Sequence, residues 1–157
     1  NSHRKLEANI IGCIGEILFE QFLKAEGVHF EDMHDNTDMD YIVNNRYTFD
    51  VKTKDRTVPP REFYECSVPL YNHNHQRPNY YYFISLERDK GCEQSDINRF
   101  KNAYLLGGID QKNLHAKGKQ WNKDEVDTRN GTRFWTDCLN VEIKDLIPNN
   151  ELLKIIK

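Results

Sequence analysis

The sequence lacks long apolar runs, and this absence is the first constraint on the class of protein. None of its apolar runs approaches the roughly 20 residues that a membrane-spanning helix needs, and no basic segment followed by an apolar one opens the chain. Hydrophobic residues make up 38% of the chain and charged residues 30%, a balance typical of soluble globular proteins. We therefore expect a cytoplasmic, intracellular protein without a membrane partner.

Paired cysteines are also missing. The four cysteines lie far apart and form no CxxC pair: Cys13, Cys66, Cys92 and Cys138. Isolated cysteines in an intracellular chain are usually reduced, and a zinc ribbon needs paired ones. His73 and His75 alternate in a polar stretch, but two further ligands at a suitable spacing are missing. We interpret that stretch as a polar loop rather than a zinc site.

The chain lacks an excess of positive charge, since 22 Lys and Arg residues are set against 25 Asp and Glu residues. The formal net charge of −3 gives no global field that would attract nucleic acid. It does not exclude such a partner, because binding depends on where the cations lie and not on their sum. The segment from Lys52 to Arg56, followed by Arg61, is locally basic.

The length of 157 residues fits one domain, residues 1–157, and no internal repeat is present. Apolar residues recur at helical spacing over residues 5–25 and predict an amphipathic helix that ends at Gly27. Gly12 and Gly15 are unexpected inside this helix, because each costs roughly 1 kcal/mol relative to alanine. We expect another part of the backbone to pass close to them.

Two segments on either side of a turn predict a β-hairpin. Residues 39–43 and 47–53 are rich in β-branched and aromatic residues, and Asn44-Asn45-Arg46 lies between them. A loop of three residues pairs Asp40 with Asp50 and gives one wholly apolar face, made of Tyr41, Val43, Tyr47, Phe49 and Val51. The opposite face carries Asp40, Ile42, Thr48, Asp50 and Lys52. A shift of one residue would mix the faces, so this register is favoured.

The rest of the chain predicts a mixture of strands and helices. Ser95 at an N-cap position predicts a short helix that runs towards Leu106 and ends at Gly107 and Gly108. Residues 57–78 contain four prolines and predict an irregular excursion, and residues 115–131 are too polar to assign. Strands are predicted at residues 64–68, 80–86 and 133–143, and the strand at 80–86 is expected to be central in the sheet. A final short helix is predicted at residues 151–156.

The hairpin carries the candidate chemistry. Two carboxylates that face each other across paired strands repel, so a cation between them would stabilise the arrangement. Asp40 and Asp50 offer the oxygen ligands that suit Mg²⁺, which takes few protein carboxylates and keeps several waters. Lys52 points the same way as Asp50 and could orient a water or stabilise charge on a phosphate. These parts fit the hydrolysis of a phosphodiester bond.

These residues resemble a known family. Asp40, followed ten residues later by Asp50-Val51-Lys52, is similar to the PD-(D/E)xK nuclease superfamily, which includes restriction endonucleases and archaeal Holliday-junction resolvases. Gly12-Cys13-Ile14-Gly15-Glu16 resembles the first helix of many members. The resemblance covers residues 9–54 and implies an α/β, restriction-endonuclease-like fold with a central mixed β-sheet flanked by helices. It further implies Mg²⁺ or Mn²⁺ held by Asp40, Asp50 and Glu16, a catalytic Lys52, and nucleic acid, DNA above all, as substrate.

Several alternatives stay open at this point. Met39 stands where the family has Pro, Asp38 shares the parity of Asp40 and is a rival ligand, and Glu20 lies one helical turn beyond Glu16. Asp50 and Lys52 are also what a solvated strand face would carry. The rival functions are an inactive nucleic-acid- or protein-binding module on the same fold and an unrelated interaction protein. The substrate structure and the formation of a homodimer are left open.

Overall fold

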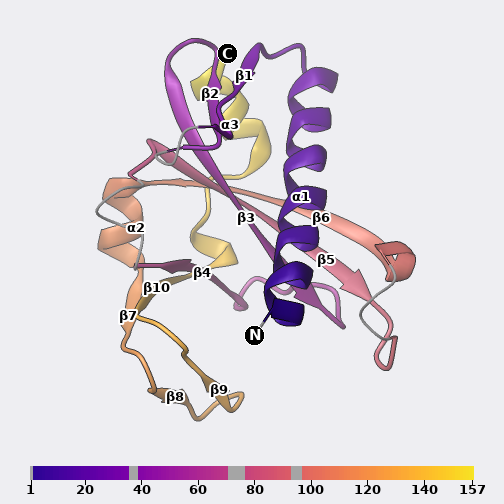
Figure 1. The fold of residues 1–157 in the computed structure, drawn as a ribbon. Coiled ribbons are helices and arrows are strands. Elements are labelled where there is room, and N and C mark those ends of the chain that lie inside the picture. The colour runs from indigo at the N-terminus through magenta and orange to yellow at the C-terminus, as the bar shows by residue number, and fades with distance from the viewer. Residues whose placement is uncertain (1, 36–38, 71–76, 93–96) are drawn as a thin grey trace.

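The computed structural model describes residues 2–35, 39–70, 77–92 and 97–157, and it is an α/β structure built in three layers (Figure 1). A mixed five-stranded sheet forms the middle layer. Helices α1 (Ser2–Ala25) and α3 (Asn149–Ile156) cover one of its faces. Helix α2 (Gln111–Lys117) and a smaller antiparallel sheet cover the other.

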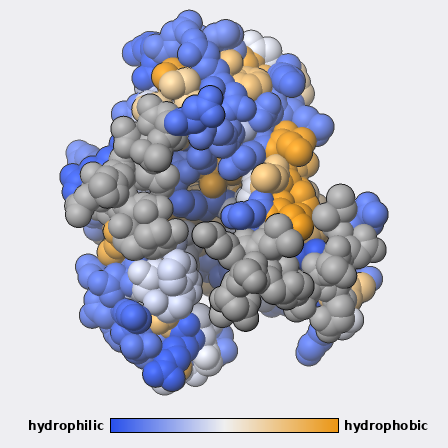
Figure 2. Space-filling model, in the orientation of Figure 1, coloured by the Kyte–Doolittle hydropathy of each residue, from blue (hydrophilic) through white to orange (hydrophobic). Residues whose placement is uncertain are grey.

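Helix α1 confirms the amphipathic helix predicted for residues 5–25. Phe19 and Leu23 are fully buried against the sheet, and the helix ends before Gly27, whose φ of 67° is one that glycine adopts without strain. Figure 2 shows hydrophobic atoms over the middle of α1, where Ile17 is 55% exposed. Among the described residues, no helix is long and apolar enough to cross a membrane.

The five-stranded sheet has the order β1-β2-β3-β5-β6. Strands β3 and β5 are parallel, and the other neighbouring pairs are antiparallel. Its strands are β1 (Phe30–Asp32), β2 (Tyr41–Val43), β3 (Tyr47–Arg56), β5 (Tyr80–Arg88) and β6 (Phe100–Asp110).

The β2–β3 hairpin has the predicted register. Tyr41 pairs with Phe49 and Val43 with Tyr47, so that the apolar face packs into the core beneath α1. The loop turns through Asn44 and Asn45, whose φ values of 53° and 57° are left-handed. Asparagine tolerates this conformation because its side chain can hydrogen-bond locally.

The position of strand β5 between two cores explains the aromatic run at its start, residues 80–83. Both of its faces are covered: Tyr82 and Ile84 belong to the core beneath α1 and α3, and Tyr81 and Phe83 to the core beneath α2. A strand buried on both sides has a continuous apolar sequence, which confirms the strand predicted at residues 80–86. It lies inside the sheet, next to the middle strand β3.

The second sheet has the order β4-β10-β7 and lies against the face of the main sheet away from α1. Its strands are β4 (Glu65–Pro69), β7 (Lys119–Trp121) and β10 (Cys138–Glu142). A two-stranded hairpin, β8 (Val126–Asp127) and β9 (Thr132–Arg133), extends from it. The late strand predicted at residues 133–143 is thus divided between β9 and β10, whereas α3 confirms the final helix.

The prediction of a short helix that runs from Ser95 towards Leu106 is wrong. That segment is a 3-10 turn, Ile97–Arg99, followed by β6, which pairs with β5 along its length. Gly107 and Gly108 do not end a helix but allow close packing: a Cβ on Gly107 would lie 2.3 Å from the backbone oxygen of Ile147. Non-local pairing with a buried strand outweighs the local helix signal. Ser95 lies outside the described residues.

Candidate functional site

Asp40 lies at the entrance to β2 and is held there by the backbone of β3. Its backbone N–H donates to the carbonyl oxygen of Phe49 at 3.0 Å, and its Oδ2 accepts a hydrogen bond from the N–H of Val51 at 2.9 Å. The β2–β3 register fixes both contacts, because Tyr41 is paired with Phe49. The hairpin therefore sets the position of the Asp40 carboxyl group.

Asp50 and Lys52 lie beside Asp40 on the face of β3 away from α1. Asp50 is only 3% exposed, and Lys52 Nζ lies 2.8 Å from Asp50 Oδ2. Burial, a hydrogen bond to Asp50 and the charge of Asp50 together raise the pKa of Asp40 to about 8. Burial alone would lower the pKa of Lys52, but the charges of Asp50 and Asp40 outweigh it and raise that pKa. The predicted trio is thus brought together.

Glu16 reaches Asp40 from α1. Gly15 lets the helix approach β3 closely, because a Cβ there would lie 1.8 Å from Thr53 Oγ1. The atoms nearest to an added Cβ at Gly15 belong to the side chain of Thr53 on β3. At Gly12 no atom lies within 4 Å of an added Cβ, so the expectation of a nearby backbone is wrong at that glycine. Burial raises the pKa of Glu16, which also senses the negative charge of Asp50.

His34 joins this cluster and was not among the residues predicted from the sequence. Its Nε2 lies 2.8 Å from Glu16 Oε2, and its Nδ1 contacts the Asp32 carboxylate. One ligand atom each from Glu16, His34 and Asp40 lies within 4.8 Å of the others. A lone histidine carries no signal in the sequence. Only the pairing of β1 with β2, with the Met33 N–H donating to the Asp40 carbonyl, brings it here.

Two residues were alternatives to the predicted ligands: Glu20 to Glu16, and Asp38 to Asp40. Glu20 does not replace Glu16, since its carboxylate accepts a 2.7 Å hydrogen bond from the Tyr41 hydroxyl. Asp38, the rival to Asp40, lies outside the described residues, and so do His73 and His75.

No protein-family model, curated protein or solved structure matches this chain.

The donor set suits a divalent cation. Asp40 links two groups, Glu16 and His34 on one side and Asp50 and Lys52 on the other. Asp50 is buried and its Oδ2 forms an ion pair with Lys52 Nζ at 2.8 Å, so one positive charge already faces this carboxylate. Glu16, Asp40 and Asp50 still set three carboxyl groups against that one ammonium, and a divalent cation would offset the excess of acidic groups. Carboxylate oxygens are the ligands that Mg²⁺ and Mn²⁺ prefer, with imidazole as a further donor.

Proposed function

We propose that this chain is a metal-dependent nuclease with a restriction-endonuclease-like fold, hydrolysing phosphodiester bonds in nucleic acid, with DNA as the expected substrate. The observation that carries the proposal is that Asp40 lies between Glu16 on α1 and the Asp50–Lys52 pair on β3. The order of elements agrees with it, since a helix is followed by a hairpin and then by a strand parallel to β3. The same residues carry the resemblance to the PD-(D/E)xK superfamily in the sequence.

Each residue has a distinct role in the proposal. Asp40, Asp50 and Glu16 would hold Mg²⁺ or Mn²⁺, with His34 orienting Glu16 through their 2.8 Å contact. The cation would supply positive charge to the phosphate and lower the pKa of water. The positively charged ammonium group of Lys52 lies beside Asp50 at the end of a flexible side chain. From this position it can donate hydrogen bonds to a phosphate oxygen or orient the attacking water.

The test is a cleavage assay over single-stranded, duplex, flap and junction substrates of DNA and RNA, with Mg²⁺, Mn²⁺ or EDTA. We expect cleavage that requires the metal. Lys52→Met should abolish cleavage while metal affinity does not fall, because the variant keeps every carboxylate. Asp50→Asn should lose both, and titration calorimetry separates the two effects.

The outcomes also separate the rival functions. Metal binding and nucleic-acid binding without cleavage would identify an inactive module on the same fold. Absence of metal binding would make the carboxylate cluster incidental. An equal loss of metal affinity in Lys52→Met and Asp50→Asn would contradict the role given to Lys52.

A further inference from the structure

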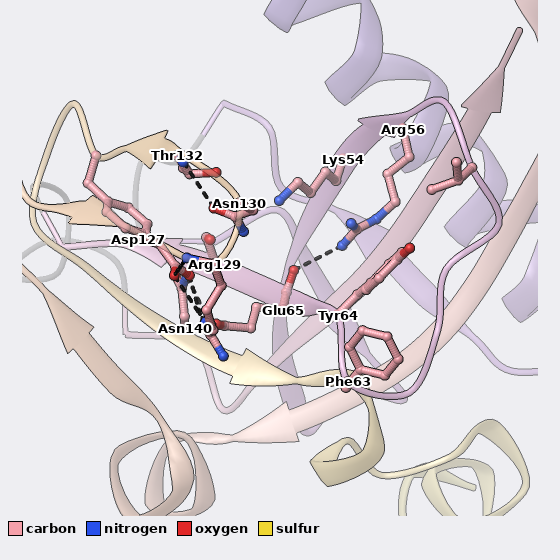
Figure 3. Close-up of a pocket in the computed structure, with 13 residues that line it drawn as sticks. Lys54, Arg56, Phe63, Tyr64, Glu65, Asp127, Arg129, Asn130, Thr132 and Asn140 are labelled. Carbon is pink, nitrogen blue, oxygen red and sulfur yellow. Dashed lines mark hydrogen bonds and ion pairs between the residues drawn. The ribbon is translucent and has the colours of Figure 1, made fainter. Parts of the chain in front are cut away.

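A cavity of about 460 Å³ lies between the end of β3, the start of β4 and the β8–β9 hairpin (Figure 3). It is distinct from the carboxylate cluster, since neither Asp40 nor Asp50 lines it. Cavities of this size commonly hold small organic groups. Its lining combines cations, aromatic rings and amides, which is the composition of a site for an anionic aromatic ligand.

Two cations on β3 project into this cavity. Lys54 and Arg56 share the strand face of Asp50 and Lys52, because side chains alternate along a strand. Figure 3 shows Lys54 pointing from β3 towards Asn130 across the cavity. No carboxylate forms an ion pair with either cation among the residues that the structure describes.

The guanidinium of Arg56 is held in place by neutral groups. It donates to Ser85 Oγ at 3.2 Å and to the carbonyl oxygen of Glu65 at 2.9 Å, and it lies over the ring of Tyr64 at 5.1 Å. These contacts orient Arg56 without cancelling its charge. Desolvation, followed by the nearby Arg56 charge, lowers the pKa of Lys54, so an anion in the cavity would relieve the repulsion between the two cations.

The two carboxylates of the cavity are already engaged. Arg129 Nη2 lies 2.5 Å from Glu65 Oε1 and 2.8 Å from Asp127 Oδ2. The lining thus carries three cations against two carboxylates, a formal net charge of +1, and both acids lie beside Arg129 rather than beside Lys54 or Arg56. The cavity therefore attracts an anion although the whole chain carries a net charge of −3.

An aromatic edge adjoins the cations. Phe63 is 59% exposed and meets the ring of Tyr64 at 5.1 Å, edge to face. Figure 3 shows both rings on the same side of the cavity, below Arg56. An exposed phenylalanine beside unpaired cations offers a stacking surface to a base whose phosphate reaches Lys54 or Arg56.

A second cavity lies beside this one, towards Lys52. Its volume is about 190 Å³, and its lining includes Lys52 together with Lys54 and Ser67, which it shares with the larger cavity. Lys52, Lys54 and Arg56 follow one another at roughly 6.6 Å intervals along the strand. They form a row of positive charge that leads from the carboxylate cluster to the aromatic edge.

We infer that the larger cavity binds a nucleotide of single-stranded nucleic acid, with the base against Phe63 and Tyr64 and the phosphate at Lys54 and Arg56. In a duplex the bases are stacked inside and cannot reach an aromatic side chain without being flipped out, whereas single strands present them freely. This inference deepens the proposed nuclease function by naming single strands, or single-stranded parts of larger substrates, as the class it engages. Binding at the cavity itself does not depend on cleavage.

The test is fluorescence anisotropy in EDTA, where metal-dependent cleavage is absent. The probes are a labelled DNA strand of about 12 nucleotides, within the usual site size, and the blunt duplex that it forms with its complement. We expect the single strand to bind at least about tenfold more tightly than the duplex. Phe63→Ala, at an exposed position, should weaken single-strand binding about 5- to 100-fold and leave the salt dependence unchanged.

Lys54→Gln should behave differently from Phe63→Ala. It should weaken binding and reduce the slope of log affinity against log salt by about 0.7, the value for one phosphate contact on a single strand. Lys154→Gln on α3 is the matched control, exposed and distant from the cavity, and should change neither. Circular dichroism melting checks that each variant is folded.

The outcomes distinguish this inference from the proposed function. Equal affinity for single strand and duplex, or unchanged affinity in Phe63→Ala, overturns the nucleotide site whatever the cleavage assay gives. Single-strand binding that both variants weaken, in a protein that cleaves nothing with Mg²⁺ or Mn²⁺, supports the nucleotide site and rejects the nuclease.

Discussion

At the scale of single residues, Asp40 links the two halves of the carboxylate cluster. Burial and the neighbouring Asp50 carboxylate raise its pKa to about 8, so the Asp40 carboxyl group carries a proton at neutral pH. That proton reduces the negative charge of the cluster in the absence of metal. Binding of a divalent cation would displace it, so metal affinity should rise with pH.

The stability of the metal-free protein should therefore depend on the Asp40 proton. Since the pKa is about 8 in the folded state and near 4 in the unfolded chain, the stabilisation is complete below about pH 4 and is lost as pH rises towards 8. Asp40→Asn cannot titrate. In EDTA, urea denaturation from about pH 5 to about pH 9 should show the free energy of unfolding of the wild type falling relative to this variant.

The control for this titration is Glu151→Gln, on an exposed position of α3. Its free energy of unfolding should follow that of the wild type at every pH. A constant difference between the wild type and Asp40→Asn across the range would show that Asp40 does not carry the proton.

At the scale of elements, the contact of α1 with β3 decides where Glu16 lies. The two glycines of α1 offer a matched comparison, because alanine gains the same helix propensity at both, and only Gly15 meets a neighbour. Gly12→Ala should raise the free energy of unfolding by up to about 1 kcal/mol. Gly15→Ala should lower it by about 1–3 kcal/mol, since the added methyl group collides with Thr53 and pushes the helix away.

Urea denaturation of the two variants measures this difference. Gly15→Ala should also weaken metal binding through the displacement of Glu16, whereas Gly12→Ala should not. Equal stabilisation by both substitutions would show that α1 is not held close to β3 at Gly15.

At the scale of the whole molecule, the carboxylate cluster couples metal binding to folding. Glu16 lies on α1 and Asp40 and Asp50 lie on the β2–β3 hairpin, so the complete metal site exists only in the folded state. A ligand that binds only the folded state contributes about 2.7 kcal/mol at a hundredfold excess over its dissociation constant. Saturating Mg²⁺ should therefore raise the melting temperature of the wild type above its value in EDTA.

Asp50→Asn is the informative variant in this melting experiment. It should respond much less to Mg²⁺. In EDTA above about pH 8, where Asp40 is ionised, it should melt at or slightly above the wild-type temperature because repulsion in the cluster is relieved. Equal shifts with Mg²⁺ would place the ion elsewhere. A much lower melting temperature in EDTA would make Asp50 a structural residue, paired with Lys52 to hold β3.

The sequence by itself determined the features that local periodicity encodes. Alternation in two short segments and a pair of asparagines were enough for the β2–β3 register, and with it the approach of Asp40 to Asp50. A continuous apolar run was enough for β5, because a strand buried on both faces needs no alternation. Only the tertiary structure brought His34 to Glu16, tied Glu20 to Tyr41, and made a strand of β6 where a helix was expected. These features depend on contacts between segments that are far apart in the chain. The periodicity within one segment does not indicate which distant segment will pack against it.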